Sequence, residues 1–522
     1  MLGALAAGGV SGVGMALAFP PADWGPLAFI ALVPLALVFR RAGAVRGRKG
    51  QLAIAATAFG LSFFALLLPW LHLFGLAAYL LVTVIETGFV VAALMLGVFA
   101  RRHLPGRWAL LAFPVAFLVG EYARSHIPVG GFPWGGLGYS QHNNPAVLHL
   151  AAYTGVWGVS FLIATVNALV AEAAAGAWAV LRHRPAGLAA WSIALPLVLA
   201  AALIPAPALL PVPTPHGAPA TIALVQGNAP NEDPADPHAL DQAALDDQVA
   251  ETQALAGRKV DLVVWPESSV GHDPFTDPAL LDPLLASIRA TGAPFIVGAT
   301  VPAPAVPGSD GHTPRFRNES LYFSATGSLL GRYVKMHLVP FGEYVPGRRW
   351  LAGWIKELDR VPADGIPGTS PTVFRLAQTP GGWFASVICY ETAYPELVQR
   401  FVAHGARLII VSTDNSSYAR SAASAQMVAI SQLRAAEERM WVTQAAITGI
   451  SAVIAPDGRV VAQTGLFRPA LLTPTVRFAT TTTLYGRFGD WFPVLVLLIG
   501  TALAIPWRPR GAGIAAAGER AA

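Results

Sequence analysis

The pattern of hydrophobic and polar positions divides the chain into two kinds of region. Up to about residue 211, long apolar stretches alternate with short polar connections. About 20 mostly apolar residues suffice for a helix to cross a bilayer. We predict seven such helices in residues 1–211 and an eighth in residues 487–522, which form an all-α membrane bundle. The predicted stretches are 2–20, 25–40, 52–73, 76–100, 107–125, 147–175, 188–210 and 488–506.

Between residues 212 and 486 the pattern changes to short β-branched runs, polar turns and longer helical stretches. Such runs between turn residues are typical of strands, and a region of this length can bury its own core. We therefore predict one α/β domain here. The expected strands are Thr221–Gln226, Asp261–Trp265, Phe295–Ala299, Leu321–Ser324, Phe384–Ile388, Leu408–Ser412 and Ala452–Ala455, and the expected helices are Asp241–Leu255 and Ser421–Met440.

Basic residues gather in every second connection of the bundle and after the last stretch. Lys and Arg are enriched in cytoplasmic loops of membrane proteins. This rule places both termini in the cytoplasm and the α/β domain on the extracytoplasmic side of the cytoplasmic membrane. The residues concerned are Arg40, Arg41, Arg46, Arg48, Lys49, Arg101, Arg102, Arg107, Arg182, Arg184, Arg508 and Arg510.

Composition agrees with a membrane protein and excludes some partners. Hydrophobic residues make up 54% of the chain and charged residues 12%, which is too apolar for a soluble protein of this length. The net charge of +5 is small and no Lys/Arg-rich run resembles a nucleic-acid surface, so no nucleic acid is expected. The stretch Leu2–Phe19 lacks a basic leading segment, so we interpret it as a retained helix. The 12 histidines are scattered, and we expect neither a metal-ligand cluster nor a cofactor.

Cys389 is the only cysteine. It follows the predicted strand Phe384–Ile388 and precedes a helix expected to start near Pro395. A thiol close to a helix N-terminus is favoured as thiolate, which would make it a nucleophile. The alternative is that Cys389 is only a small buried hydrophobic side chain.

Two other segments carry groups that such a nucleophile needs. Glu267 ends a buried strand where Pro266 interrupts the pairing, and Lys335 and Glu343 lie in a mostly apolar run. Each has an ordinary explanation: a solvated carboxylate, a Lys extending to water, and a Glu paired with an arginine. Together they supply a base for the thiol and a cation for an oxyanion.

Three motifs resemble the nitrilase (carbon–nitrogen hydrolase) superfamily. They are Trp265-Pro266-Glu267, the K-x-H-x-x-P-F-G-E segment Lys335–Glu343, and Cys389-Tyr390-Glu391. With the predicted helices and the segments Gly131-Phe132-Pro133-Trp134 and Gly138-Tyr139-Ser140-Gln141, the chain resembles the apolipoprotein N-acyltransferase family. The resemblance implies a nitrilase-like αββα sandwich, with Glu267 as general base, Lys335 as oxyanion stabiliser and Cys389 as nucleophile. It also implies supporting roles for Glu343, Tyr390 and Glu391, with the Tyr390 N–H as a second oxyanion donor.

The same resemblance implies the reaction. A monomeric enzyme without a cofactor takes an acyl chain from a phospholipid as a Cys389 thioester. It then passes the acyl chain to the N-terminal amine of an S-diacylglyceryl-cysteine apolipoprotein. Two alternatives remain: a membrane-tethered amidase acting on small amides, and a membrane scaffold whose nitrilase-like domain is inert.

Three features stay open at this stage. The connection Glu121–Asn144 is either an aromatic belt at the membrane interface or a re-entrant wall lining a lipid-accessible cavity. Apolar residues at helical spacing from Trp350 to Leu358 form either a core-facing helix or a lid. Family members often carry an aromatic near the position of Ala235, and segment 412–418 also departs from the expected pattern, which leaves substrate fit undetermined.

Overall fold

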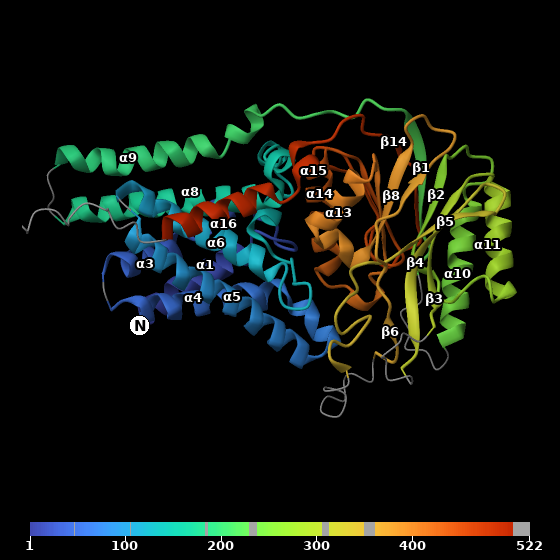
Figure 1. Cartoon of the computed structure of the whole chain (residues 1–522), viewed down its shortest axis with the longest axis horizontal. Coiled ribbons are helices and arrows are strands. Elements are labelled where there is room, and N and C mark those ends of the chain that lie inside the picture. The colour runs from blue at the N-terminus through green and yellow to red at the C-terminus, as the bar shows by residue number, and fades with distance from the viewer. Residues whose placement is uncertain are drawn as a thin grey trace, which may run out of the picture.

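A helical bundle and an α/β domain lie end to end in the computed structural model of the chain (Figure 1). The structure describes residues 1–45, 47–104, 106–182, 186–228, 237–304, 313–348 and 361–504. The segment from Trp350 to Leu358 and Ala235 lie outside these residues.

Each of the eight predicted apolar stretches contains a helix. The helices are α1 (Leu2–Ala16), α2 (Ala28–Ala31) with α3 (Val33–Ala44), α4 (Lys49–Leu67), α5 (Leu76–His103), α6 (Ala112–Arg124), α8 (Ala151–Leu181), α9 (Ala186–Leu203) and α16 (Trp491–Ala504). Among the described residues, four helical segments are long and apolar enough to cross a membrane: Gly25–Ala44, Lys49–Leu67, Leu76–Arg102 and Ala151–Leu181. The count of eight crossings stays a prediction.

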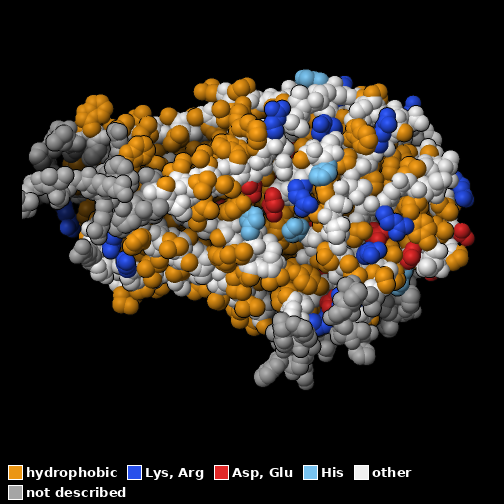
Figure 2. Space-filling model, viewed as in Figure 1, with side chains coloured by type: hydrophobic (Ala, Val, Ile, Leu, Met, Phe, Trp, Pro, Cys, Tyr) orange, Lys and Arg blue, Asp and Glu red, His pale blue; other side chains and the backbone are white. Residues whose placement is uncertain are grey.

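The bundle directs many apolar side chains outward. Only 39–44% of the most apolar window is buried in three of the four long segments. Leu80, Val84, Leu96 and Leu498 are among the large hydrophobic side chains that are exposed. Figure 2 shows hydrophobic side chains covering much of the bundle half, whereas charged side chains are more frequent over the α/β domain. Such a surface is costly in water and suited to lipid.

The α/β domain contains two sheets. The first has the order β13-β1-β2-β3-β4-β5 and the second the order β12-β11-β10-β9-β8-β7. The strands of the first are β1 (Pro219–Gln226), β2 (Leu262–Val270), β3 (Phe295–Pro302), β4 (Arg315–Phe323), β5 (Leu329–Val334) and β13 (Ala470–Leu472), with β6 (Asp364–Gly365) and β14 (Thr475–Arg477) at its margins. Those of the second are β7 (Val373–Arg375), β8 (Trp383–Ile388), β9 (Ile409–Thr413), β10 (Val442–Ala446), β11 (Ala452–Ile454) and β12 (Val460–Gln463).

Helices cover both outer faces, which gives the expected αββα sandwich. Helices α10 (Pro237–Gln253) and α11 (Pro278–Thr291) cover the first sheet, and α13 (Pro395–Ala403) and α14 (Ala423–Glu438) cover the second (Figure 1). Alternation along β2 explains the layering, because Val263 and Trp265 share a core with α11 while Val264 joins the core between the sheets. Ser320 and Ser386 meet across that interface with their hydroxyl oxygens 2.9 Å apart.

All seven expected strands and both expected helices of this domain are present, with shifted ends. The largest shift is in β4, which begins at Arg315, whereas the sequence predicted only Leu321–Ser324. The longest strands that were not predicted are β5 and β10, because polar residues interrupt their apolar pattern. The short strands β6, β7, β12, β13 and β14 were not predicted either.

The layer of α13 and α14 faces the bundle. Gln426 of α14 contacts four groups of the bundle, and the carboxylate of Glu437 accepts a hydrogen bond from the N–H of Val156 near the start of α8 (2.7 Å). Residues from the connection Glu121–Asn144 are buried in this junction, including Trp134. The connection therefore forms a wall between the two parts rather than a belt facing lipid.

Candidate active site

The nucleophile candidate sits on a sharp turn between a strand and a helix. Cys389 follows β8 and begins the short 3-10 helix η7 (Cys389–Ala393), which leads into α13. Its φ of +51° is in the left-handed region, where a side chain costs about 1–3 kcal/mol. The strand end and turn direct the thiol to the carboxyl edge of the sheet, and only 5% of the residue is exposed.

Glu267 lies where the pairing of β2 becomes irregular. Regular pairing with β3 runs to Trp265 and shifts before Val270, as expected from Pro266. The Oε2 atom of Glu267 accepts a hydrogen bond from the N–H of Asp414 at 2.8 Å. The carbonyl oxygen of the same Asp414 lies 4.0 Å from the Sγ of Cys389. The backbone of Asp414 thus joins the carboxylate to the thiol.

Lys335 directly follows β5 and is 1% exposed. Its Nζ donates to Oε1 of Glu267 and to Oε1 of Glu343, each at 2.9 Å. Burial alone would lower the pKa of Lys335, but the two carboxylates outweigh burial and raise this pKa well above its ordinary value. Lys335 therefore keeps its charge at the centre of the group.

Burial of Cys389 opposes the thiolate form that the nearby helix start favours. Burial, together with the charge of Glu267, raises the pKa of the Cys389 thiol well above its ordinary value, although Lys335 and Thr413 oppose the shift. The hydroxyl of Thr413 donates to Sγ at 3.2 Å. A helix start can be read from sequence, but this desolvation cannot. The thiol is thus protonated at neutral pH and requires a base to react.

Glu343 and an unpredicted residue, Asn318, complete the polar group. Glu343 pairs with Lys335 and with no arginine among the described residues, and its Oε2 accepts from the N–H of Val339 at 2.8 Å. The amide of Asn318 donates to Oε1 of Glu267 at 2.6 Å and to Oε1 of Glu343 at 2.9 Å. No signal in the sequence indicated it, because Asn318 is one of several neighbouring polar residues in strand β4. Asn318 and Lys335 together hold the two carboxylates side by side.

Glu391 connects the thiol turn to the segment that carries Lys335. Its Oε2 accepts from the N–H of Ile388 at 2.9 Å. Its Oε1 accepts from the Tyr333 hydroxyl at 2.6 Å, the Met336 N–H at 2.6 Å and the His337 N–H at 3.1 Å. These bonds fix the strained turn against β5, so the geometry gives Glu391 a positioning role.

Tyr390 faces the bundle. Its hydroxyl lies 3.1 Å from that of Tyr394, which donates to the carbonyl of Gly131 at 3.0 Å. Its ring stacks on Phe132 with the ring centroids 6.4 Å apart. Other aromatic side chains continue this surface, with Tyr418 packed on Trp70 at 5.2 Å. The thiol is therefore next to an aromatic wall that belongs to both parts of the molecule.

The ring of His337 packs against Tyr394 with the ring centroids 4.3 Å apart, in line with a packing role. The fold brings His126, Glu396 and Asp490 together from distant segments, a grouping that the scattered histidines of the sequence did not indicate. These three residues form a group separate from that of Cys389, Glu267 and Lys335.

Comparisons with known proteins cover both parts of the chain. Residues 11–169 match the apolipoprotein N-acyltransferase N-terminal domain, and residues 221–485 match the carbon–nitrogen hydrolase family. A protein of Geobacter metallireducens named apolipoprotein N-acyltransferase is 32% identical over 492 residues, which cover 92% of this chain and 91% of that protein. A protein of the same name from Mycolicibacterium smegmatis is 32% identical, covering 95% of this chain and 83% of that protein. Among solved structures, an amidase from Nesterenkonia sp. is 21% identical, with a TM-score of 0.34, covering 52% of this chain and 94% of that one.

Proposed function

The chain belongs to the apolipoprotein N-acyltransferase family, and we propose that Cys389, Glu267 and Lys335 perform its acyl transfer. The protein is an acyltransferase that N-acylates lipoproteins. One observation carries the assignment of residues. The thiol, a carboxylate and an ammonium are all buried at one edge of the sandwich and are joined through Asp414 and the 2.9 Å pair of Lys335 with Glu267.

In the first half-reaction, Cys389 attacks the ester carbonyl of a phospholipid. Glu267 accepts the thiol proton as the S–C bond forms. The ammonium of Lys335 stabilises the oxyanion, aided by the N–H of Tyr390, which lies in the first turn of η7 and has no partner within that helix. The intermediate collapses to a thioester, and Glu267 returns the proton to the departing lysophospholipid oxygen.

In the second half-reaction, the amine of an S-diacylglyceryl cysteine attacks the thioester. Glu267 accepts a proton from the attacking nitrogen, and the same donors hold the second oxyanion. The C–S bond breaks, the sulfur regains the proton from Glu267, and the product is an amide. Glu343 and Asn318 hold the base in place throughout.

The surroundings of the thiol favour transfer over hydrolysis. A thioester persists only where water is kept away, and burial of Cys389 beside the wall of Phe132 and Tyr418 supplies such a place. Both substrates are lipids, so a site at the end of an apolar bundle receives them already concentrated and oriented. An amidase acting on small amides would not require the bundle, and an inert scaffold would not require the buried Lys335.

The proposal includes eight membrane crossings, both termini in the cytoplasm and the catalytic domain outside. The positions of three arginines support it. Arg40 and Arg101 pair with Glu172 at 2.8 and 3.7 Å, and Arg102 donates to the carbonyl of Ala42 at 3.0 Å. Glu172 lies about 24 Å along α8 from Val156, which contacts the catalytic domain. This basic end of the bundle is the cytoplasmic end under the positive-inside rule. Arg46, Arg184, Arg508 and Arg510 lie outside the described residues.

Trapping the thioester tests the mechanism. Purified protein in phospholipid vesicles, without acceptor, is expected to gain the mass of one acyl chain on the Cys389 peptide. Adding a diacylglyceryl peptide should remove that mass and acylate the peptide amine. Cys389→Ala should gain nothing, whereas the control His404→Gln, at an exposed position, should behave as wild type.

Two results would contradict the mechanism. An unmodified Cys389 together with ammonia release from small amides would favour the amidase. Full support of lipoprotein maturation in cells by Cys389→Ala would favour the scaffold.

A further inference from the structure

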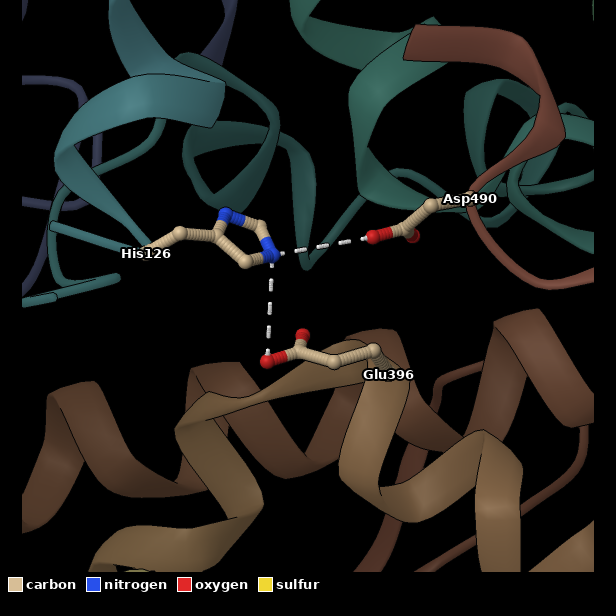
Figure 3. Close-up of side chains that lie close together, drawn as sticks. All are labelled: His126, Glu396 and Asp490. Atoms are coloured by element: carbon tan, nitrogen blue, oxygen red, sulfur yellow. Dashed lines mark ion pairs between the residues drawn. The ribbon is translucent and has the colours of Figure 1, made fainter. Parts of the chain in front are cut away.

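Three ligand-type side chains converge where the bundle meets the catalytic domain. His126 follows α6, Asp490 precedes α16, and Glu396 lies in the first turn of α13 (Figure 3). The Nε2 atom of His126 is 4.0 Å from Oε1 of Glu396 and 4.0 Å from Oδ2 of Asp490. All three ligand atoms lie within 4.8 Å of one another. These distances are too long for hydrogen bonds, so the atoms surround a common point without bonding to each other.

In His126 and Asp490, the polar atom that points away from the group forms hydrogen bonds that fix the side chain. The Nδ1 atom of His126 lies 2.7 Å from the carbonyl of Tyr122, which can only accept, so Nδ1 donates to it and Nε2 is the atom directed at the two carboxylates. Oδ1 of Asp490 accepts from the indole of Trp157 at 2.8 Å and from the hydroxyl of Tyr485 at 3.3 Å. That leaves Oδ2 to face His126. Outer hydrogen bonds of this kind orient ligands in metal sites.

The acidic side chains in the group outnumber the basic one, which favours binding of a cation. Two carboxylates face one imidazole, and like charges this close repel each other. Arg434 acts on both carboxylates from a distance, but its own ion pair is with Glu437 at 3.0 Å. A cation among the three atoms would balance the two carboxylates directly.

We propose that His126, Glu396 and Asp490 bind a divalent transition-metal ion, for which Zn²⁺ is the best match. Imidazole suits Zn²⁺, whereas Mg²⁺ and Ca²⁺ take oxygen ligands. Bonds of about 2.0–2.2 Å place the ligand atoms of a tetrahedral zinc about 3.4 Å apart, so side-chain shifts of about 1 Å would close the shell. The side chains of His126, Glu396 and Asp490 are 32%, 30% and 12% exposed, so the ion can enter and water can complete the coordination.

The ion would join three segments that the chain leaves separate. His126 and Asp490 belong to the ends of bundle helices, while Glu396 belongs to the helix that follows the Cys389 turn. Binding would therefore fasten the catalytic domain to the bundle near the nucleophile. This is a structural role, independent of the acyl-transfer mechanism proposed above.

Metal titration tests the site. The full chain, free of any affinity tag and stripped with EDTA in detergent, is titrated with Zn²⁺ by calorimetry and with Co²⁺ by visible absorption. We expect one ion per chain, a Co²⁺ spectrum with nitrogen–oxygen ligation, and a melting temperature that rises with Zn²⁺. His126→Gln, Glu396→Gln and Asp490→Asn should each weaken binding at least about tenfold. His404→Gln is the matched control, because its ring also contacts a backbone carbonyl four residues earlier, at 2.7 Å, but faces no carboxylate pair in the described part of the chain.

The variants His126→Gln and Glu396→Gln are the decisive tests of zinc binding, because both change partly exposed side chains and should leave the fold intact. The proposal is overturned if the wild type takes up no Zn²⁺. It is equally overturned if either of these variants binds Zn²⁺ and gains thermal stability to the same extent as His404→Gln.

Discussion

The ammonium of Lys335 lies 2.9 Å from the carboxylate of Glu267. The proposed base and the proposed oxyanion stabiliser are thus bonded to each other before any substrate arrives. Because both are buried, neither has water as an alternative partner, and the charge of each depends on the other. Substitution of one should therefore affect both catalysis and stability.

Lys335→Met should slow formation of the acyl-enzyme by at least about 100-fold, because the oxyanion loses its cation. It should also lower the free energy of unfolding by about 3–5 kcal/mol, since Glu267 and Glu343 lose the cation that they share. Single-turnover mass spectrometry and thermal melting in detergent measure the two effects. Arg332→Met is the control, because Arg332 lies on strand β5, just before Lys335, but is about half exposed. A thioester rate within threefold of wild type would rule out the role given to Lys335.

The reactivity of the thiol should respond in opposite directions to its two charged neighbours. Glu267 raises the pKa of Cys389 and Lys335 lowers it. Glu267→Gln should therefore move the pH profile of alkylation by iodoacetamide to lower pH, and Lys335→Met should move it to higher pH. Both variants should nevertheless fail to form the thioester. Profiles that move in the same direction would show that charge is not the cause.

The raised pKa of Cys389 also predicts a pH dependence of stability. The folded thiol keeps its proton to higher pH than the unfolded thiol, whose pKa is about 8.5. Its contribution to stability is therefore complete below that value and is lost as pH rises through the folded pKa. The melting temperature of the wild type should fall more between pH 8 and pH 10 than that of Cys389→Ser. An equal fall would contradict the shift.

The three residues proposed as catalytic could be singled out from sequence because each lies in a short motif next to a predicted strand. Asn318 could not, because its part depends on strand β4 lying between Glu267 and Lys335 in space, and one Asn in a strand carries no such information. The desolvation of the Cys389 thiol could not be predicted for a related reason. The helix start that favours a thiolate is local in sequence, whereas the burial that opposes it comes from the whole domain. The group of His126, Glu396 and Asp490 was missed because its members are up to 364 positions apart in the chain.

Asn318→Leu should reduce the rate of thioester formation about 10- to 100-fold, because each hydrogen bond to a charged group is worth about 1.5–3 kcal/mol. Asn318 positions the base and does not touch the substrate, so kcat should fall while KM for phospholipid stays near wild type. Asn318→Asp should be worse, since it adds a third carboxylate to the pair. Kinetics with vesicle-borne phospholipid give both constants. A change confined to KM would instead place Asn318 in lipid binding.

Gln426→Leu should destabilise the junction between the two parts of the molecule. The side-chain oxygen of Gln426 accepts from the indoles of Trp70 at 3.1 Å and Trp134 at 2.7 Å. Its nitrogen donates to the carbonyls of Pro20 at 3.2 Å and Leu67 at 3.0 Å. Leucine keeps the volume but leaves four buried polar groups unpaired, at about 1–3 kcal/mol each if nothing relaxes.

The matched control is Gln399→Leu, because Gln399 donates a single bond to the carbonyl of Gly486 at 2.9 Å. Thermal melting in detergent should show a loss for Gln426→Leu several times that of Gln399→Leu. Tryptophan emission should change before the main transition, since Trp70 and Trp134 lose their shared acceptor. Equal losses for the two variants would mean that the junction is held by apolar packing alone and that Gln426 merely fills it.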